Sequence, residues 1–370
     1  MDKFRFFGIP FIFKVISILS FLGLLFCYLA PLIHPETIFI LPFLGLAYPI
    51  ILTVNLFILV VWSLFRSKWA LFCILVLLIG GKLHFRAFAF NLWEDSKKQN
   101  ELRVLSYNVR LFDIYNPSRA GALETRDKIF SFIRKENPDI LCIQEFYRQD
   151  HPTNFPTIDS LYAIMGTTIY HERSAYKRHA NQNFGIALFS KYPMIAKGDV
   201  MFDAQSSEDF NYCIYADIVK DSDTFRFYNV HLQSIKFQSD YYQIKSGNPI
   251  DNLTDESTIK YMLKKLHIAF QKRAEQARRV AEHAKTSPYP TIVCGDFNDT
   301  PLSYTYNQFN RTLTDAFLNT SIGIGATYIG KLPAGRIDYI FHSPELSSYD
   351  FKIQKEELSD HRAISCTIAK

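Results

Sequence analysis

The residues best suited to chemistry stand where an apolar run stops, in the stretch TIVCGDFNDTPLS at 291–303. Asp296 and Asn298 lie two positions apart, so an extended backbone would direct both side chains to the same face. A carboxylate and an amide placed in this way can hold a metal ion or a substrate oxygen. An Asx-rich turn at the end of a strand would use the same residue types for backbone geometry, so this stretch alone leaves both interpretations open.

Five other apolar runs also meet a carboxylate, an amide or an imidazole. The runs LRVLSYNV, PDILCIQEF, FRFYNVHLQS, GRIDYIFHS and LSDHRAISCTI contain, in that order, Asn108, Glu145, His231, Asp338, and the pair Asp360 and His361. Each has an ordinary alternative, such as a turn, a helix end, a loop pair or a satisfied buried histidine. Asp338 is the hardest to explain in that way, because a carboxylate inside the apolar stretch 337–341 needs a partner to offset its desolvation. Six such places, each beside an expected strand, indicate a chemical site more strongly than any one alone.

Strands and helices must alternate to position these residues. Apolar or β-branched runs recur at 102–108, 140–144, 184–190, 211–219, 225–230, 291–294, 337–341 and 363–369. Apolar stripes at helical spacing lie between several of them, at 125–136 and 259–285. We therefore expect one α/β domain over 102–370, with the polar segment 237–256 as a surface excursion.

The first 90 residues have a different composition, dominated by apolar runs at 11–32, 38–65 and 69–81. A membrane span needs about 20 mostly apolar residues. The first two runs meet that length, and the third does so if Lys82 and Arg86 extend to the interface. The first run could also be a cleaved signal peptide, but its length and the runs after it favour retention. We predict a membrane region of about three transmembrane helices over 1–90 and a linker over 91–101.

Basic residues predict the orientation of these spans. Lys3 and Arg5 precede the first run, and Arg66 and Lys68 lie between the second and third. Lysine and arginine are retained on the cytoplasmic side. The protein is thus expected in the inner or plasma membrane, with the large domain on the extracytoplasmic side; without a third span the domain would be cytoplasmic.

Charge and cysteine content narrow the possible partners. Beyond residue 90 the chain carries 34 basic and 34 acidic residues. A neutral domain counts against non-specific binding to nucleic acid, which usually needs a basic face. The six cysteines show no zinc-site or disulfide-framework spacing and are expected to be buried thiols.

The blocks SYNV, QE, GDFN, RIDYIF and SDH, in this order across 102–370, resemble the endonuclease/exonuclease/phosphatase superfamily. It includes deoxyribonucleases, apurinic-site endonucleases, sphingomyelinases and inositol 5-phosphatases. The resemblance implies a four-layer α/β sandwich, in which two packed mixed β-sheets are flanked by helices and the site lies at one end of the sheets. It also implies a metal-dependent, phosphodiesterase-like or nuclease-like hydrolase of phosphoric esters, whose substrate is a phosphodiester or a phosphomonoester.

The resemblance also implies a metal site. Glu145 would bind the ion, with Asn108 and Asp360 nearby. Such hard oxygen ligands suit Mg²⁺, or Mn²⁺, and not zinc.

Five further residues take catalytic roles by the same resemblance. Asp296 would activate or orient the attacking water, and Asn298 would hold a phosphate oxygen. His361 would contact the scissile phosphate or act as a base, and Asp338 would orient a histidine. His231 would contact the substrate phosphate.

Three weaker candidates complete the set as substrate-binding residues: Asn183, Tyr328 and Arg336. The expected partners are a phosphoester substrate, either a lipid headgroup or a nucleic acid, and the membrane; no obligate protein partner is indicated. Two alternatives stay open, namely a nuclease tethered to the cell envelope and a non-catalytic membrane receptor or scaffold that keeps the fold.

Overall fold

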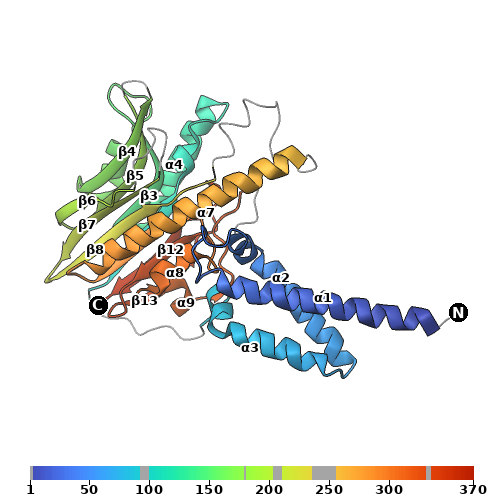
Figure 1. Cartoon of the computed structure of the whole chain (residues 1–370). Coiled ribbons are helices and arrows are strands. Elements are labelled where there is room, and N and C mark those ends of the chain that lie inside the picture. Colours follow the sequence, from blue (N-terminus) through green and yellow to red (C-terminus); the bar gives the residue numbers. More distant parts are fainter. Residues whose placement is uncertain (1–2, 92–99, 179–180, 203–210, 236–255, 331–334) are drawn as a thin grey trace.

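The computed structural model consists of three long N-terminal helices attached to an α/β body (Figure 1). It describes residues 3–91, 100–178, 181–202, 211–235, 256–330 and 335–370. Most of the expected linker at 91–101 and of the expected surface excursion at 237–256 therefore falls outside the described residues.

Three N-terminal helices are long and apolar enough to cross a membrane: α1 (Lys3–Leu29), α2 (Leu41–Leu64) and α3 (Trp69–Ala87). They pack together as a bundle with a small polar contact inside. The Tyr48 hydroxyl lies 2.5 Å from Nδ1 of His84, and Nε2 of His84 lies 2.8 Å from the carbonyl oxygen of Leu77. Such contacts hold apolar helices together where water is absent. We refer to α1, α2 and α3 as the three-helix bundle.

Two six-stranded sheets form the centre of the body. The first has the order β10 (Thr314–Asp315), β12 (Asp338–His342), β9 (Thr291–Asp296), β8 (Asp223–His231), β7 (Tyr212–Lys220) and β6 (Met194–Asp199). The second has the order β13 (Ser347–Ile353), β14 (Ile364–Ala369), β2 (Leu102–Asn108), β3 (Ile140–Gln149), β5 (Gln182–Ser190) and β4 (Tyr170–Arg178). Both are mixed, because β8 and β9 are parallel, as are β2 and β3, while the other neighbours are antiparallel.

The sheets pack face to face, and helices cover their outer faces. Val104 and Leu188 of the second sheet share one apolar core with Ile214 and Phe227 of the first. Helices α4 (Arg119–Glu136) and α5 (Ile158–Met165) cover the second sheet, and α7 (Glu256–Lys285) and α8 (Tyr304–Asn310) cover the first. This four-layer sandwich confirms the predicted fold class. It follows from strands that are buried on both faces and so need cover on both.

Short elements complete the chain: β1 (Ala89–Phe90) pairs with β11 (Ile322–Gly323), and η1 (Arg110–Asp113) and α9 (Ala316–Thr320) are single turns. All six cysteines are buried and free.

The three-helix bundle is attached to the sandwich mainly through α8 and the loop before it. Asn307 accepts a hydrogen bond from Nη1 of Arg86 at 2.9 Å and donates to the carbonyl oxygen of Pro31 at 2.8 Å. Leu302 is 1% exposed and belongs to the apolar cluster of the bundle. A Cβ at Gly45 would lie 2.6 Å from the Leu302 carbonyl oxygen. Backbone and side chains thus meet closely at this contact.

Arg336 belongs to the same contact and not to a substrate surface, which corrects the role expected from the sequence. Its side chain is 1% exposed and pairs with Asp315. Its Nη2 donates at 2.7 Å to the carbonyl oxygen of Arg86, at the end of α3. A guanidinium without water around it needs such partners, so Arg336 joins the body to α3 and cannot reach a substrate phosphate here.

Replacing Arg336 should therefore destabilise the protein without removing any group from the surface. We expect Arg336→Met to lower the free energy of unfolding by about 3–5 kcal/mol, because Asp315 would be left as a buried unpaired charge. Chemical denaturation of the full-length protein in detergent measures it. Arg362→Met is the matched control: Arg362 pairs with the exposed Glu357, and its loss should cost no more than about 1 kcal/mol. Equal losses in both variants would contradict this account.

Candidate active site

The polar residues singled out in the sequence meet where strands from both sheets end. Strands β8 and β9 run parallel and place His231 beside Asp296, while β12 pairs Asp338 with Asp296 on the other side. From the second sheet, β2 ends at Asn108, whose amide Nδ2 lies 3.0 Å from Oδ2 of Asp296. Parallel neighbours end at the same edge of a sheet, and the face-to-face packing brings the two edges together. The fold thus unites groups that lie far apart in the chain.

Asp296 is the centre of this cluster and is 1% exposed. Its Oδ1 accepts a hydrogen bond from the backbone N–H of Asn298 at 2.8 Å. Its Oδ2 accepts from the side-chain amides of Asn298 at 3.1 Å and Asn108 at 3.0 Å. Burial raises the pKa of Asp296, and the neighbouring His361 opposes that rise. A buried carboxylate held in this way is a stronger base than one in water.

The side chain of Asn298 contacts other protein groups, and its amide nitrogen is not available for the phosphate contact expected from the sequence. Its Nδ2 donates to Asp296 and also to the carbonyl oxygen of Leu232 at 3.1 Å. An amide nitrogen has only two hydrogens, so both are used inside the protein. In this structure Asn298 positions Asp296 and offers a substrate only its amide oxygen.

Backbone geometry explains why the GDFN block has glycine at position 295 and asparagine at position 298. Gly295 has φ 145°, and a Cβ there would lie 1.9 Å from the carbonyl oxygen of Val230 on the adjacent strand. Asn298 has φ 53°, a left-handed conformation that asparagine tolerates better than most residues. The turn that aims Asp296 into the site therefore depends on both residue types.

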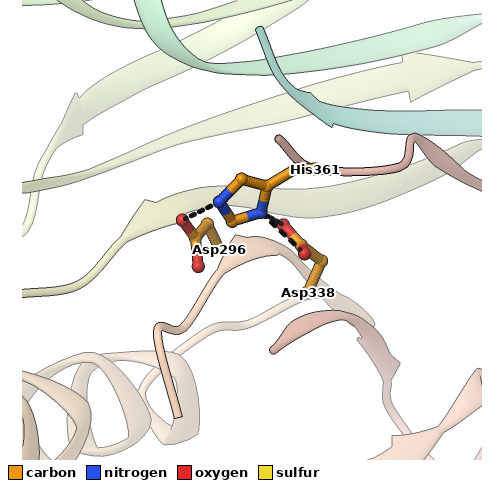
Figure 2. A group of neighbouring side chains, drawn as sticks. All are labelled: Asp296, Asp338 and His361. Carbon is orange, nitrogen blue, oxygen red and sulfur yellow. Dashed lines mark hydrogen bonds and ion pairs between the residues drawn. The ribbon is translucent and has the colours of Figure 1, made fainter. Parts of the chain in front are cut away.

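His361 bridges two carboxylates, as Figure 2 shows. Its Nδ1 lies 3.0 Å from Oδ2 of Asp338, and its Nε2 lies 3.6 Å from Oδ2 of Asp296. Burial opposes a charge on the ring, but Asp338 and Asp296 outweigh it and raise the pKa of His361 to about 10. The ring is therefore an imidazolium at neutral pH, with Nδ1–H donating to Asp338 and Nε2–H directed toward the centre of the cluster.

Glu145 and Asp360 form the more open side of the cluster. Glu145 lies at a bulge of β3 with φ 49°, and its side chain is 31% exposed. Its Oε1 lies 3.3 Å from Nδ2 of Asn108 and 4.0 Å from Nε2 of His231. Burial and the like charge of Asp360 raise the pKa of Glu145 to about 7. Like charges gathered in this way favour the binding of a cation.

Of the three substrate-binding candidates, only Tyr328 lies at the site. It forms an isolated β-bridge with His361, and the two rings are 5.1 Å apart. Burial and the carboxylate of Asp360 raise the pKa of Tyr328 to about 12. Asn183 is 1% exposed and donates to Asp150 at 3.2 Å, with no described contact to the cluster. Arg336 lies in the contact with α3, as described above.

Two residues at the site were not expected from the sequence. The Ser359 hydroxyl donates to the carbonyl oxygen of Asn108 at 2.8 Å and fixes the strand end that carries it. The Arg110 guanidinium lies 4.0 Å from Oδ2 of Asp360 and is 52% exposed. Ser359 stands in the SDH block, which could have drawn attention to it, whereas adjacency to Asn108 was the only signal for Arg110.

The donor atoms fit a hard divalent cation better on one side of the cluster than on the other. Asp296, Asp338 and His361 each place a potential ligand atom within 4.8 Å of the others. The raised pKa of His361 disfavours metal ligation by its ring, because an ion would first have to displace a proton from a ring nitrogen. The other side supplies the carboxylate oxygens of Glu145 and Asp360, the donor type that Mg²⁺ and Mn²⁺ prefer. Asn108 turns its amide nitrogen toward Glu145, and its amide oxygen accepts a hydrogen bond from the backbone N–H of Arg110.

Comparisons with known proteins agree with this fold. A model of the Endonuclease/Exonuclease/phosphatase family matches residues 105–361, more than half of the chain. A second model, described as a domain of unknown function (DUF8431), matches residues 10–87. A comparison with curated proteins found no match.

Solved structures share the fold at low sequence identity. A protein of the same family from Bacteroides thetaiotaomicron has 16% identity and a TM-score of 0.50, covering 74% of this chain and 96% of that chain. The catalytic domain of human Nocturnin with bound sulfate has 18% identity and a TM-score of 0.49, covering 73% and 93%. A family protein from Leptotrichia buccalis has 18% identity and a TM-score of 0.47, covering 73% and 100%.

Asp338→Asn should weaken the hold on the buried imidazolium. Without the Asp338 charge, burial would weigh more heavily against the charged ring, and the pKa of His361 should fall from about 10 toward its ordinary value of 6.5. A group with a raised pKa stabilises the fold below the unfolded value and loses this effect as pH rises to the folded value. The variant should therefore lose stability most below pH 6.5 and least above pH 10.

Imidazole NMR signals of His361 and the free energy of unfolding against pH measure the two effects. Asp150→Asn, outside the cluster, should leave the His361 titration unchanged. An unshifted His361 pKa in Asp338→Asn would exclude Asp338 as the source of the charge.

Proposed function

Because the chain belongs to the Endonuclease/Exonuclease/phosphatase family, we propose that it is a membrane-anchored, divalent-metal-dependent hydrolase of a phosphoester at the bilayer surface, such as a lipid headgroup. Residues 1–90 would form the membrane region and 102–370 the catalytic domain. The observation that carries the proposal is the short chain segment that joins the Asp296 cluster to the three-helix bundle. The loop that follows Asp296 and contains Asn298 continues to Leu302, which is buried among the apolar residues of the three-helix bundle.

The sites of attachment support a domain that sits on the membrane surface. The body contacts the loop after α1, through Pro31, and the end of α3, through Arg86. Four exposed apolar side chains lie on or next to the short ribbon of β1 and β11 at the end of α3, where lipid would cover them: Phe88, Phe90, Ile322 and Ile324. The basic loop between α2 and α3 lies at the opposite end of the bundle. By the retention of basic residues inside, the domain would be extracytoplasmic.

Glu145, Asp360 and Asn108 would hold the metal ion. When bound, the ion would supply positive charge to the phosphoryl oxygens and favour a nucleophilic water. This charge would also lower the pKa of Glu145 again, since a cation reverses the effect of the carboxylates around it.

The chain's own groups would carry the proton transfers. Asp296, fixed by Asn298 and Asn108, would accept a proton from the attacking water or orient it. His361, held protonated by Asp338, would donate its Nε2 hydrogen to a phosphoryl oxygen and stabilise the charge that develops there. His231, whose Nε2 lies 3.7 Å from Oδ2 of Asp296, would contact the phosphate from the other side.

Product release by the full-length protein in lipid vesicles tests the proposal. With Mg²⁺ or Mn²⁺, we expect turnover of a phospholipid, sphingolipid or phosphoinositide ester, lowered about 10²–10⁴-fold by Asp296→Asn or His361→Gln. Glu282→Gln, an exposed change on the far part of α7, should have no effect. Metal-dependent cleavage of plasmid DNA or RNA without lipid turnover would instead identify a tethered nuclease. No turnover of any of these esters, or of soluble bis-p-nitrophenyl phosphate, would favour a binding role.

Metal affinity should depend on pH through Glu145. Protons and the ion compete for this carboxylate, so affinity should weaken by up to about tenfold for each pH unit below the pKa, which is about 7 without the ion. Isothermal titration of Mg²⁺ into the full-length protein on both sides of that pH measures it. Glu145→Gln should bind more weakly and lose the dependence. A pH-independent affinity in the native protein would place the ion elsewhere.

A further inference from the structure

The first turns of α7, residues 256–272, differ in burial from the rest of the helix. Among the described side chains of this segment, none before Ala269 is buried, whereas Ala274 and Ala277 further along are fully buried against the first sheet. Ile259 and Leu263 are 41% and 47% exposed. The apolar stripe of the helix therefore continues past the edge of the sandwich.

The same segment is basic. It contains one acidic residue, Glu256, and four lysines: Lys260, Lys264, Lys265 and Lys272. The rest of α7, residues 273–285, has four basic and two acidic residues, and Arg278 there pairs with Glu275 and Glu282. A helix with an apolar stripe and an excess of lysine on its other faces is typical of helices that lie in a membrane interface.

Contacts with α2 place this segment beside the membrane region. The Phe270 ring lies 5.3 Å from that of Phe43, in the first turn of α2. The His267 ring lies 6.2 Å from that of Phe39, two residues before α2 begins. Helical spacing puts positions 259, 263 and 270 on one face. Figure 1 shows the start of α7, in orange, projecting beyond the sheets on the side where the bundle lies. The exposed stripe therefore continues a face that already touches a membrane helix.

We propose that residues 256–272 of α7 form an interfacial helix that binds anionic phospholipids of the bilayer crossed by the three-helix bundle. Ile259 and Leu263 enter the boundary between headgroups and acyl chains, and the lysines face lipid phosphates. The excess of lysine favours an anionic surface over a second copy of the same basic helix, and the contact with α2 favours the bilayer. The proposal rests on membrane insertion and is independent of the hydrolysis proposed above.

Spin labels on the full-length protein in vesicles test this placement. A nitroxide at Leu263→Cys reports on the segment, one at Phe57→Cys in the middle of α2 reports on insertion, and one at Glu282→Cys is a water-exposed control on the same helix. In vesicles of phosphatidylcholine with phosphatidylglycerol, we expect the label at 263 to gain oxygen contact and lose contact with a water-soluble nickel reagent by several-fold, approaching the label at 57. In phosphatidylcholine alone, after Lys260→Glu with Lys264→Glu, or in high salt, it should resemble the label at 282.

Three outcomes would overturn the proposal. The label at 263 could stay in water in both lipid mixtures while that at 57 lies in lipid. It could be shielded from both reagents regardless of lipid charge, which would mean that a second copy or another protein covers the stripe. A label at 57 in contact with water would remove the membrane insertion itself, and with it the membrane part of the proposed function, whereas loss of hydrolysis alone leaves this inference standing.

Discussion

Asp296 is a buried carboxylate, and the need to satisfy its charge inside the protein constrains much of the surrounding structure. A carboxylate that is 1% exposed has lost its water, so its oxygens must be satisfied by the protein. Asn298, in the turn after β9 of the first sheet, and Asn108, at the end of β2 in the second sheet, supply these hydrogen bonds. The sandwich therefore has to close face to face before the charge can be held, and the site and the fold are stabilised by the same contacts.

The positive partner of this charge is subject to the same constraint. His361 is also buried, yet it stays protonated because Asp338 and Asp296 lie on its two sides. Asp338 begins a strand paired with β9, so its distance from Asp296 is fixed by sheet register. Two carboxylates that would repel each other are thereby joined by one imidazolium. The arrangement provides a proton donor and a proton acceptor side by side, which suits hydrolysis of a phosphoester.

The contacts with the three-helix bundle hold the site at a defined place relative to these helices. Leu302, six residues after Asp296, is buried in the apolar cluster of the bundle, and Asn307 and Arg336 join the body to the ends of the apolar helices. These are short, buried contacts and not a flexible tether. They make the position of the site relative to the three-helix bundle a property of the fold.

The sequence by itself determined the fold class, the three apolar helices and the group of residues that meet in the cluster, because strand and helix periodicity and the polar blocks at strand ends are local patterns. It could not decide which atoms are free to meet a substrate. Arg336, the first residue of the RIDYIF block, looked like a phosphate contact, but the tertiary structure buries it against Asp315 and the end of α3. Asn298 looked like a phosphate ligand, but both of its amide hydrogens are used inside the protein. Ser359 and Arg110 gave little local signal, since their roles depend on partners distant in the chain. The side-chain types are written in the sequence, whereas burial and hydrogen-bond partners arise only when distant segments pack.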